Sequence, residues 1–355
     1  MVKVAVATSS RADYGLLKPL LDEIARTDLD LNLIVTGSHL CREFGYTVQE
    51  IEYPHERIEI SLSSDTPEAI SKSMALAQIG VSEIFNRIDP DCLIVLGDRF
   101  EIFAICSVAH IFNIPIIHIH GGEVTSGAYD DAFRHSITKM SHLHFVAAEP
   151  YRERVIQLGE HPDTVYNVGA LGCDGLSKRL EFKNNQSCVM LYSPETLNSG
   201  YTFDLYYFLT HSLKLYVKVI NSGIDKGCKK YRKEGATSSY PREAYLDMLK
   251  KSDFIIGNSS SSVIEAPALG VPSILIGDRQ KGRLLASSII EADCTENSIY
   301  NAINELYSNE FQEMMDTYYH TPYKGGDVAR KILDAISRQF KYIDMKKGFY
   351  DIKNS

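Results

Sequence analysis

The sequence predicts an α/β protein built on parallel β-sheets, and three observations lead to this fold class. Short apolar, β-branched runs alternate with helical segments from residue 2 to about residue 169, which is typical of a parallel sheet with helices on both faces. The same alternation starts again at residue 189. The length of 355 residues fits about two domains of ~150 residues. We expect an N-terminal domain over 1–169, a C-terminal domain over 170–327, and a helix with a tail over 328–355 that crosses back onto the first domain.

The beginning of the chain predicts a cradle for an anion. Val2–Ala7 suits a buried strand, Leu16–Ile24 a helix, and Leu31–Val35 a second strand. The turn over 9–15 joins the first strand to the helix, whose N-terminal N–H groups can face an anion. Arg11 adds a cation to this turn, although a place on the surface would explain this arginine equally well.

The next stretch predicts a long helix after two shorter elements. Cys41–Ile51 is a candidate helix and Ile58–Leu62 a candidate strand. Thr66 is expected to cap the long helix, with Pro67 at its first position. Its apolar face recurs at alternating spacings of four and three, at Ile70, Met74, Ala77, Val81, Ile84 and Ile88.

Two of the predicted strands end in charged residues. Cys92–Leu96 is followed by Asp98 and Arg99, and Ile114–Ile119 is followed, after a histidine and two glycines, by Glu123. In open α/β sheets, ligands bind at the carboxyl ends of the strands. These side chains are therefore expected to meet at one end of the sheet.

Asp130 and Arg134 add to this group. They are four residues apart, so on a helix they share one face. Alone, they would be explained by an ordinary ion pair on a helix, but the arrival of Glu123 at the same sheet end favours a site. The other elements of this half are a helix over Phe103–Phe112 and strands over Leu143–Ala147 and Val165–Val168.

The second half repeats the alternation. Its expected strands are Val189–Tyr192, Leu215–Ile220, Phe254–Ile256 and Ser273–Ile276, and its expected helices are Phe203–Leu213, Glu243–Lys250, Val263–Leu269, Ile299–Tyr307 and Val328–Phe340. Residues 226–239 are polar and rich in lysine, and predict a loop with a short helix.

A run of four serines follows the strand at 254–256. Ser259 to Ser262 lie between a strand and a helix, where hydroxyls and backbone N–H groups can bind phosphate. Neither a P-loop nor G-x-G-x-x-G is present. Glu265 is expected one to two turns into the helix, where a carboxylate can accept from ribose hydroxyls. A serine-rich turn with a helix cap is an equally good explanation of the run by itself.

Composition excludes several classes of protein. The net charge of −9 argues against binding of nucleic acid or of a membrane surface through bulk charge. The seven cysteines are odd in number and scattered without a C-x-x-C pair, which predicts reduced thiols and no zinc site. No apolar run approaches the ~20 residues of a membrane helix. We expect a cytoplasmic protein that forms a homodimer or homotetramer.

Several stretches together resemble the hydrolysing UDP-N-acetylglucosamine 2-epimerases of sialic and legionaminic acid synthesis. They are, in order, Ser10–Gly15, Val35–Leu40, Gly97–Glu101, His118–Glu123, Asp130–Phe145, Asn167–Leu176, Gly257–Pro272 and Gly277–Arg283. The resemblance implies a fold like that of the GT-B glycosyltransferases, with two Rossmann-like domains and an active-site cleft between them. It also implies a UDP-sugar substrate, UDP as product, and no cofactor or metal.

The resemblance assigns roles to individual residues. It implies that Asp98, Glu123 and Asp130 are catalytic carboxylates with Arg134 beside them. The residues implied in UDP binding are Arg11 and Arg99 near the phosphates, Ser259 and Ser260 on the pyrophosphate, Glu265 on the ribose, and Arg279 on the nucleotide side. The reaction implied is elimination of UDP to a glycal, followed by addition of water.

One residue departs from the pattern. The family usually has a histidine, associated with the diphosphate, where this chain has Ser193. Three alternatives follow: a non-hydrolysing 2-epimerase, a GT-B glycosyltransferase, and a nucleotide-sugar-binding protein that has lost catalysis. A non-hydrolysing enzyme is less favoured, because those relatives differ at the first and fourth motifs.

Overall fold

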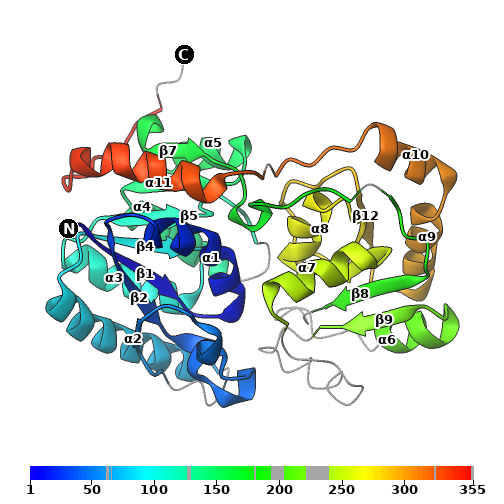
Figure 1. Ribbon diagram of the computed structural model, residues 1–355, viewed down its shortest axis with the longest axis horizontal. Helices are drawn as coiled ribbons and strands as arrows, with labels where there is room; N and C mark the ends of the chain where they lie inside the picture. Colours follow the sequence, from blue (N-terminus) through cyan, green and yellow to red (C-terminus); the bar gives the residue numbers. More distant parts are fainter. Residues whose placement is uncertain are drawn as a thin grey trace. The chain divides into compact units, whose positions relative to one another are not determined.

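The computed structural model describes residues 1–60, 64, 66–125, 129–179, 181–192, 204–220, 240–323 and 325–352. They form two compact units. The N-terminal unit contains residues 1–123, 129–174 and those from 327 onward, and the C-terminal unit contains 124–125 and residues between 175 and 326 (Figure 1).

The N-terminal unit is built on a seven-stranded parallel sheet in the order β3-β2-β1-β4-β5-β6-β7. Its strands are β1 (Lys3–Thr8), β2 (Asp30–Val35), β3 (His55–Arg57), β4 (Cys92–Leu96), β5 (Ile116–Ile119), β6 (Leu143–Val146) and β7 (Val165–Asn167). The parallel sheet predicted from the alternation of strands and helices is confirmed.

Helices cover both faces of this sheet (Figure 1). They are α1 (Arg11–Ala25), α2 (Pro67–Ile88), α3 (Phe100–Ile111), α4 (Asp130–Met140), α5 (Glu149–Gln157) and α11 (Val328–Gln339). Alternate residues of β1 point into separate cores: Val4 and Val6 pack with α1 and α11, whereas Ala5 and Ala7 pack with α2 and α3. A strand buried on both faces reads as a continuous apolar run, as β1 does.

Local chemistry explains where the first helix begins. The Ser10 side chain accepts from the backbone N–H of Asp13 at 3.3 Å. The Asp13 carboxylate in turn accepts from the hydroxyl and backbone N–H of Ser9 at 2.8 and 3.3 Å. These reciprocal bonds satisfy donors at the helix N-terminus, so α1 starts at Arg11, five residues earlier than expected.

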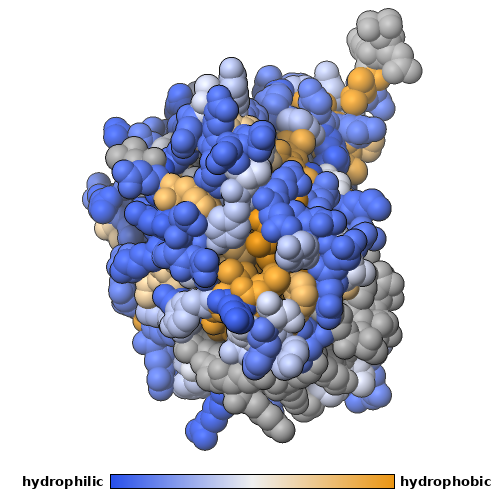
Figure 2. All heavy atoms as spheres, turned by 90° about the vertical axis from the view of Figure 1, so that its right-hand side faces the viewer, coloured by the Kyte–Doolittle hydropathy of each residue, from blue (hydrophilic) through white to orange (hydrophobic). Residues whose placement is uncertain are grey.

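The C-terminal unit has a five-stranded parallel sheet in the order β12-β11-β10-β8-β9. Its strands are β8 (Ser187–Leu191), β9 (Tyr216–Val219), β10 (Phe254–Gly257), β11 (Ser273–Ile276) and β12 (Ile289–Ala292). Its helices are α6 (Leu205–Tyr207), α7 (Arg242–Lys251), α8 (Glu265–Ala268), α9 (Glu296–Leu306) and α10 (Asn309–Thr317). The face in Figure 2 is mostly hydrophilic, with a small apolar group near its centre, because most apolar side chains of this unit lie in two cores on either side of the sheet.

Four elements differ from the prediction. The helix expected over 41–51 is two short 3₁₀ helices, Arg42–Phe44 and Thr47–Glu50, because Gly45 between them adopts φ +93°. The strand expected over 58–62 lies at β3 instead, and part of that expected range falls outside the described residues. The helix expected over 263–269 is shortened to α8. β12 and α10 were not expected.

The capping of α2 agrees with the sequence, since the Thr66 hydroxyl accepts from the N–H of Ala69 with Pro67 at the first helical position. No helix within the described ranges is long and apolar enough to cross a membrane. The loop expected over 226–239 lies outside the described residues.

Candidate active site

The predicted residues of the N-terminal unit lie at the carboxyl ends of neighbouring strands. Arg11 follows β1, Asp98 and Arg99 follow β4, and Glu123 follows β5. These three strands are adjacent in the sheet. Parallel strands end at one edge, so residues far apart in sequence collect there. The first two turns of α4 bring Asp130 and Arg134.

Arg134 joins two of the predicted carboxylates. Its guanidinium donates to Glu123 Oε2 at 3.2 Å through Nη1 and to Asp98 Oδ2 through Nη2. Arg134 and Glu123 are 3% and 2% exposed, so water barely screens this pair. Burial disfavours the charge on Arg134, but the two carboxylates outweigh it and raise its pKa. Asp98, Glu123 and Arg134 therefore form one cluster, as the resemblance implied.

His120 completes this cluster, and the sequence prediction did not include it among the site residues. Its Nε2 accepts from the backbone N–H of Leu171 at 3.2 Å. The hydrogen must then be on Nδ1, which donates to Glu123 Oε1 at 2.7 Å. His120 also has a positive φ of 65°, an unusual backbone conformation for a histidine. Its position directly after β5 was the signal in the sequence.

Arg99 is held by an acidic partner that was also missed. Its Nη2 and Nε donate to the two oxygens of Glu101 at 2.9 and 3.2 Å. The Glu101 side chain is fully buried at the start of α3. Burial opposes the charge on Arg99, but Glu101 and then Asp13 raise its pKa, with a smaller contribution from Asp130. This last effect places the Asp130 charge near Arg99.

Arg11 occupies the first position of α1 and pairs with Glu50 through Nε at 2.7 Å. Its Nη1 is buried and has no hydrogen-bond partner among the described residues. Burial lowers the pKa of Arg11, although Glu50 counteracts the effect. An arginine N–H buried without an acceptor is costly, and an anionic oxygen would satisfy it.

His118 connects the cluster to the far half of α4. Its Nε2 donates to the carbonyl of Gly97 at 2.8 Å, and its Nδ1 accepts from the Thr138 hydroxyl at 3.1 Å. Burial lowers the pKa of His118 to about 3, so the ring is neutral. His118 therefore fixes the residue preceding Asp98 to the helix that carries Arg134.

The serine run of the C-terminal unit forms a tight turn after β10. Ser259 caps a 3₁₀ helix over Ser260–Ser262 and accepts from the N–H of Ser261 at 3.2 Å. Ser260 is exposed and Ser259 half-buried, so both predicted residues are accessible. Ser261 instead faces inward and bonds to the Tyr245 hydroxyl at 2.5 Å.

Glu265 is the first residue of α8, not one to two turns into a longer helix as predicted. Since α8 has four residues, phosphate binding here depends on the serine turn more than on a helix dipole. The Glu265 carboxylate is 8% exposed and lies 3.6 Å from the guanidinium of Arg242. Arg242 was not predicted, because the residues around it gave no motif.

Arg279 follows β11 in the same unit and is half-buried. Next to it, Gln280 donates to the carbonyl of Asn258 at 2.9 Å, which ties this segment to the serine turn. Arg279 thus lies beside a residue that contacts the turn. Ser193 lies outside the described residues.

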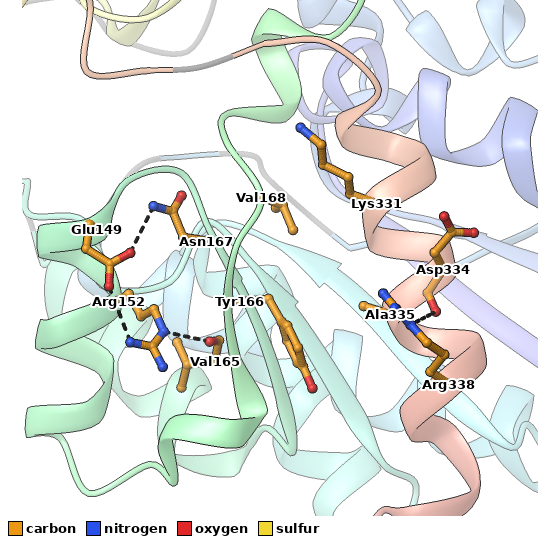
Figure 3. A pocket seen from close by; sticks show the side chains of 10 residues that line it. All are labelled: Glu149, Arg152, Val165, Tyr166, Asn167, Val168, Lys331, Asp334, Ala335 and Arg338. Carbon is orange, nitrogen blue, oxygen red and sulfur yellow. Dashed lines mark hydrogen bonds and ion pairs between the residues drawn. The ribbon is translucent and has the colours of Figure 1, made fainter.

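Two cavities of the N-terminal unit lie apart from these residues. The larger, about 490 Å³, opens between α5, β7 and α11, and Figure 3 shows charged side chains on both of its sides. None of the predicted site residues lines it or the second cavity. Within the described part of the chain, no cluster of three or more His, Cys, Asp or Glu side chains could hold a metal ion.

A family model described as UDP-N-acetylglucosamine 2-epimerase matches residues 22–211 and 213–337. The chain belongs to this family. It is 36% identical over 387 aligned residues to the polysialic acid biosynthesis protein P7 of Escherichia coli, covering 99% of this chain and 98% of that protein. It is 37% identical over 343 residues to the GDP/UDP-N,N'-diacetylbacillosamine 2-epimerase (hydrolyzing) of Campylobacter jejuni, covering 88% and 89%.

Solved structures show the same fold. The UDP-GlcNAc 2-epimerase of Methanocaldococcus jannaschii, in complex with UDP-GlcNAc and UDP, has a TM-score of 0.75 at 15% identity, with 95% of this chain and 100% of that chain covered. The enzyme of Neisseria meningitidis bound to UDP-GlcNAc has a TM-score of 0.73 at 16% identity and the same coverage. The predicted family and α/β fold class are thus confirmed.

Proposed function

We propose that the protein is a hydrolysing 2-epimerase, which converts a UDP-2-acetamido sugar and water into UDP and the free 2-epimer. The observation that carries the proposal is the cluster at the sheet edge, where Arg134 holds Asp98 and Glu123 from two different strands. A sugar-transfer reaction does not need carboxylates gathered from separate strand ends. Relatives named as hydrolysing enzymes support the same function.

The chemistry runs in two steps. A carboxylate takes the proton from C2 while the C1–O bond to UDP breaks, which leaves a double bond between C1 and C2. Water then adds its hydroxyl to C1, and a proton returns to C2 from the opposite face. The C2 proton is a weak acid, so the base needs a fixed position shielded from water. Glu123 meets this need: it is 2% exposed and held by His120 and Arg134.

Asp98 and Asp130 complete the acid–base group. Asp98 is more exposed than Glu123, with 19% of its side chain accessible, and can exchange a proton with a bound substrate. Asp130 lies one helical turn before Arg134 on α4. Separate carboxylates let one accept a proton while another donates.

The leaving diphosphate requires cations and N–H donors. We assign Arg11 and Arg99 to the phosphates, since Arg11 Nη1 has no acceptor among the described residues and Arg99 is oriented by Glu101. Ser259 and Ser260 supply hydroxyls and backbone N–H groups to the pyrophosphate.

The remaining nucleotide contacts are assigned to the C-terminal unit. Glu265 accepts from the ribose hydroxyls and Arg279 lies on the nucleotide side. The sugar is N-acetylglucosamine or a 2,4-diacetamido-6-deoxy analogue, as in the bacillosamine enzymes. Both carry the same C2 acetamido group, so one mechanism serves either.

Incubation with each UDP-sugar in D₂O, followed by NMR, tests the proposal. Elimination and rehydration place deuterium at C2 of a released sugar with inverted C2, together with UDP. A released sugar with C2 unchanged and undeuterated would show transfer to water instead. An epimer still attached to UDP would show a non-hydrolysing enzyme.

Amide variants provide matched controls, since they keep the shape of a carboxylate but cannot exchange its proton. Glu123→Gln should lose turnover by a factor on the order of 10²–10⁴ while UDP still binds. Asp98→Asn and Asp130→Asn should behave likewise. Full activity in all three variants would refute the acid–base assignment.

A further inference from the structure

A second buried charge cluster lies at the opposite end of α4 from the active-site residues. Its centre is Glu160, whose carboxylate is 1% exposed. It accepts from His144 Nε2 at 3.0 Å, Lys139 Nζ at 2.6 Å and Lys347 Nζ at 2.6 Å. Burial alone would raise the pKa of Glu160, but these donors lower it to about 2. The proposed reaction uses none of the four groups.

Lys347 comes from the segment after α11 and reaches the C-terminal end of α4. Its ammonium lies 3.3, 2.8 and 2.5 Å from the carbonyls of Thr138, Lys139 and Ser141. These are the last carbonyls of the helix, which have no partners within it. A cation at this place satisfies them and is favoured by the helix dipole. Lys347 thus caps α4 and pairs with Glu160 at the same time.

Neighbouring contacts hold the segment in place. The N–H of Tyr350 donates to the carbonyl of Gly159 at 2.9 Å. The Phe349 ring lies so close to Gly159 that any side chain there would collide with it, and Lys139 Nζ lies 4.9 Å from the centre of the same ring. The segment therefore bonds to both α4 and the turn that carries Glu160. We call residues 343–350 the C-terminal clasp.

The clasp is connected to the active site through α4. Arg134, in the second turn of the helix, bonds to Asp98 and Glu123. Thr138, whose carbonyl faces Lys347, bonds through its hydroxyl to His118, which bonds to the carbonyl preceding Asp98. A shift of α4 along its axis would move Arg134 and strain the His118 contact together.

We propose that Lys347 is a positioning residue for the epimerase reaction, because it fixes the C-terminal end of α4 and thereby holds Arg134 against Asp98 and Glu123. The catalytic part of this inference rests on the proposed function. A displacement of about 1 Å at reacting groups can cost orders of magnitude in rate. A clasp that controls the helix position therefore affects turnover, while nucleotide contacts of the C-terminal unit are unaffected.

Lys347→Met tests the proposal, and Lys346→Met is the matched control, since Lys346 is the exposed neighbour in the same segment. Turnover is measured well below the unfolding temperature of each variant, beside the Kd for UDP. We expect kcat to fall about tenfold or more in Lys347→Met, with UDP affinity unchanged. Lys347→Arg, which keeps the charge, should regain part of the loss. A purely structural role would lower the unfolding temperature and leave kcat of the folded enzyme unchanged, which would overturn the proposal.

Two further measurements keep the test decisive. If Lys347→Met does not fold, Phe349→Ala removes another clasp contact and is judged by the same criterion. A double-mutant cycle of the Lys347 variant with Arg134→Lys should show effects on kcat that are less than additive. Full additivity would show that Lys347 does not act through Arg134.

Hydrogen exchange separates this inference from the proposed function. In Lys347→Met, backbone amides of α4 near Asp130 and Arg134 should exchange faster than in the wild type or in Lys346→Met. This result needs no substrate, so it holds even if the wild type releases no UDP. Unchanged exchange in α4 would refute the clasp independently of any activity.

Discussion

Replacement of Arg134 by methionine is the sharpest test of the charge cluster. Methionine keeps the length and apolar contacts of the side chain but removes both ion pairs, to Asp98 and Glu123. Since Glu123 is 2% exposed, its charge would lose its main partner in a site that water does not reach. Removal of one partner from a buried ion pair costs about 3–5 kcal/mol. Turnover should fall below detection, because neither carboxylate keeps its position.

Thermal and urea unfolding measure the cost in stability. In a unit of this size, 1 kcal/mol corresponds to about 2–4 °C in Tm, so Arg134→Met should lower Tm by roughly 6–20 °C. The second variant Arg134→Met with Glu123→Gln removes the buried charge as well. It should recover about 1–3 kcal/mol, since a neutral amide is cheaper to bury than an unpaired carboxylate, without recovering activity. If the double variant is no more stable than Arg134→Met alone, the cluster does not carry the buried charge as described.

Three further predictions concern binding and stability. Millimolar UDP should raise Tm by mass action, and Ser260→Ala should reduce the shift; no shift in the wild type would count against the phosphate turn. Ser193→His should tighten UDP binding by up to about 1.5–3 kcal/mol, the value of a charge-assisted hydrogen bond, and titration calorimetry would reveal a separate role for Ser193 if affinity does not rise. The pKa of Glu160 is lowered from 4.5 to about 2, so its contribution is complete above pH 4.5 and is lost as pH falls through about 2. Glu160→Gln should therefore lose about 2–3 kcal/mol at pH 7 and less at pH 3; an equal loss at both values, measured by urea unfolding, would refute the pairing.

The elements of the fold could be predicted from the sequence where one local pattern dominates. The apolar run of β1 and the capped, amphipathic α2 are examples, because strand and helix periodicities are written in neighbouring residues. The prediction failed where a single backbone conformation decides. Gly45 at positive φ divides the expected helix over 41–51 into two turns.

The candidate site was partly predictable for a related reason. Asp98 and Glu123 directly follow apolar strands, and parallel strands must end at a common edge, so the topology brings them together. The sequence also carried the motifs that placed the chain in its family, which the comparisons confirmed. The catalytic and nucleotide-binding roles of the individual residues stay predictions.

Only the tertiary structure decided which groups pair. The sequence placed Arg134 beside Asp130 on one helical face, but the fold directs its guanidinium to Asp98 and Glu123. The tautomer of His120 follows from a backbone N–H of Leu171, far along the chain. Lys347 and Glu160 belong to no motif, yet they meet at the end of α4. A local pattern records what a residue needs from its neighbours in sequence, whereas a buried charge needs a partner in space, and that partner is fixed only when the sheet and its helices are packed.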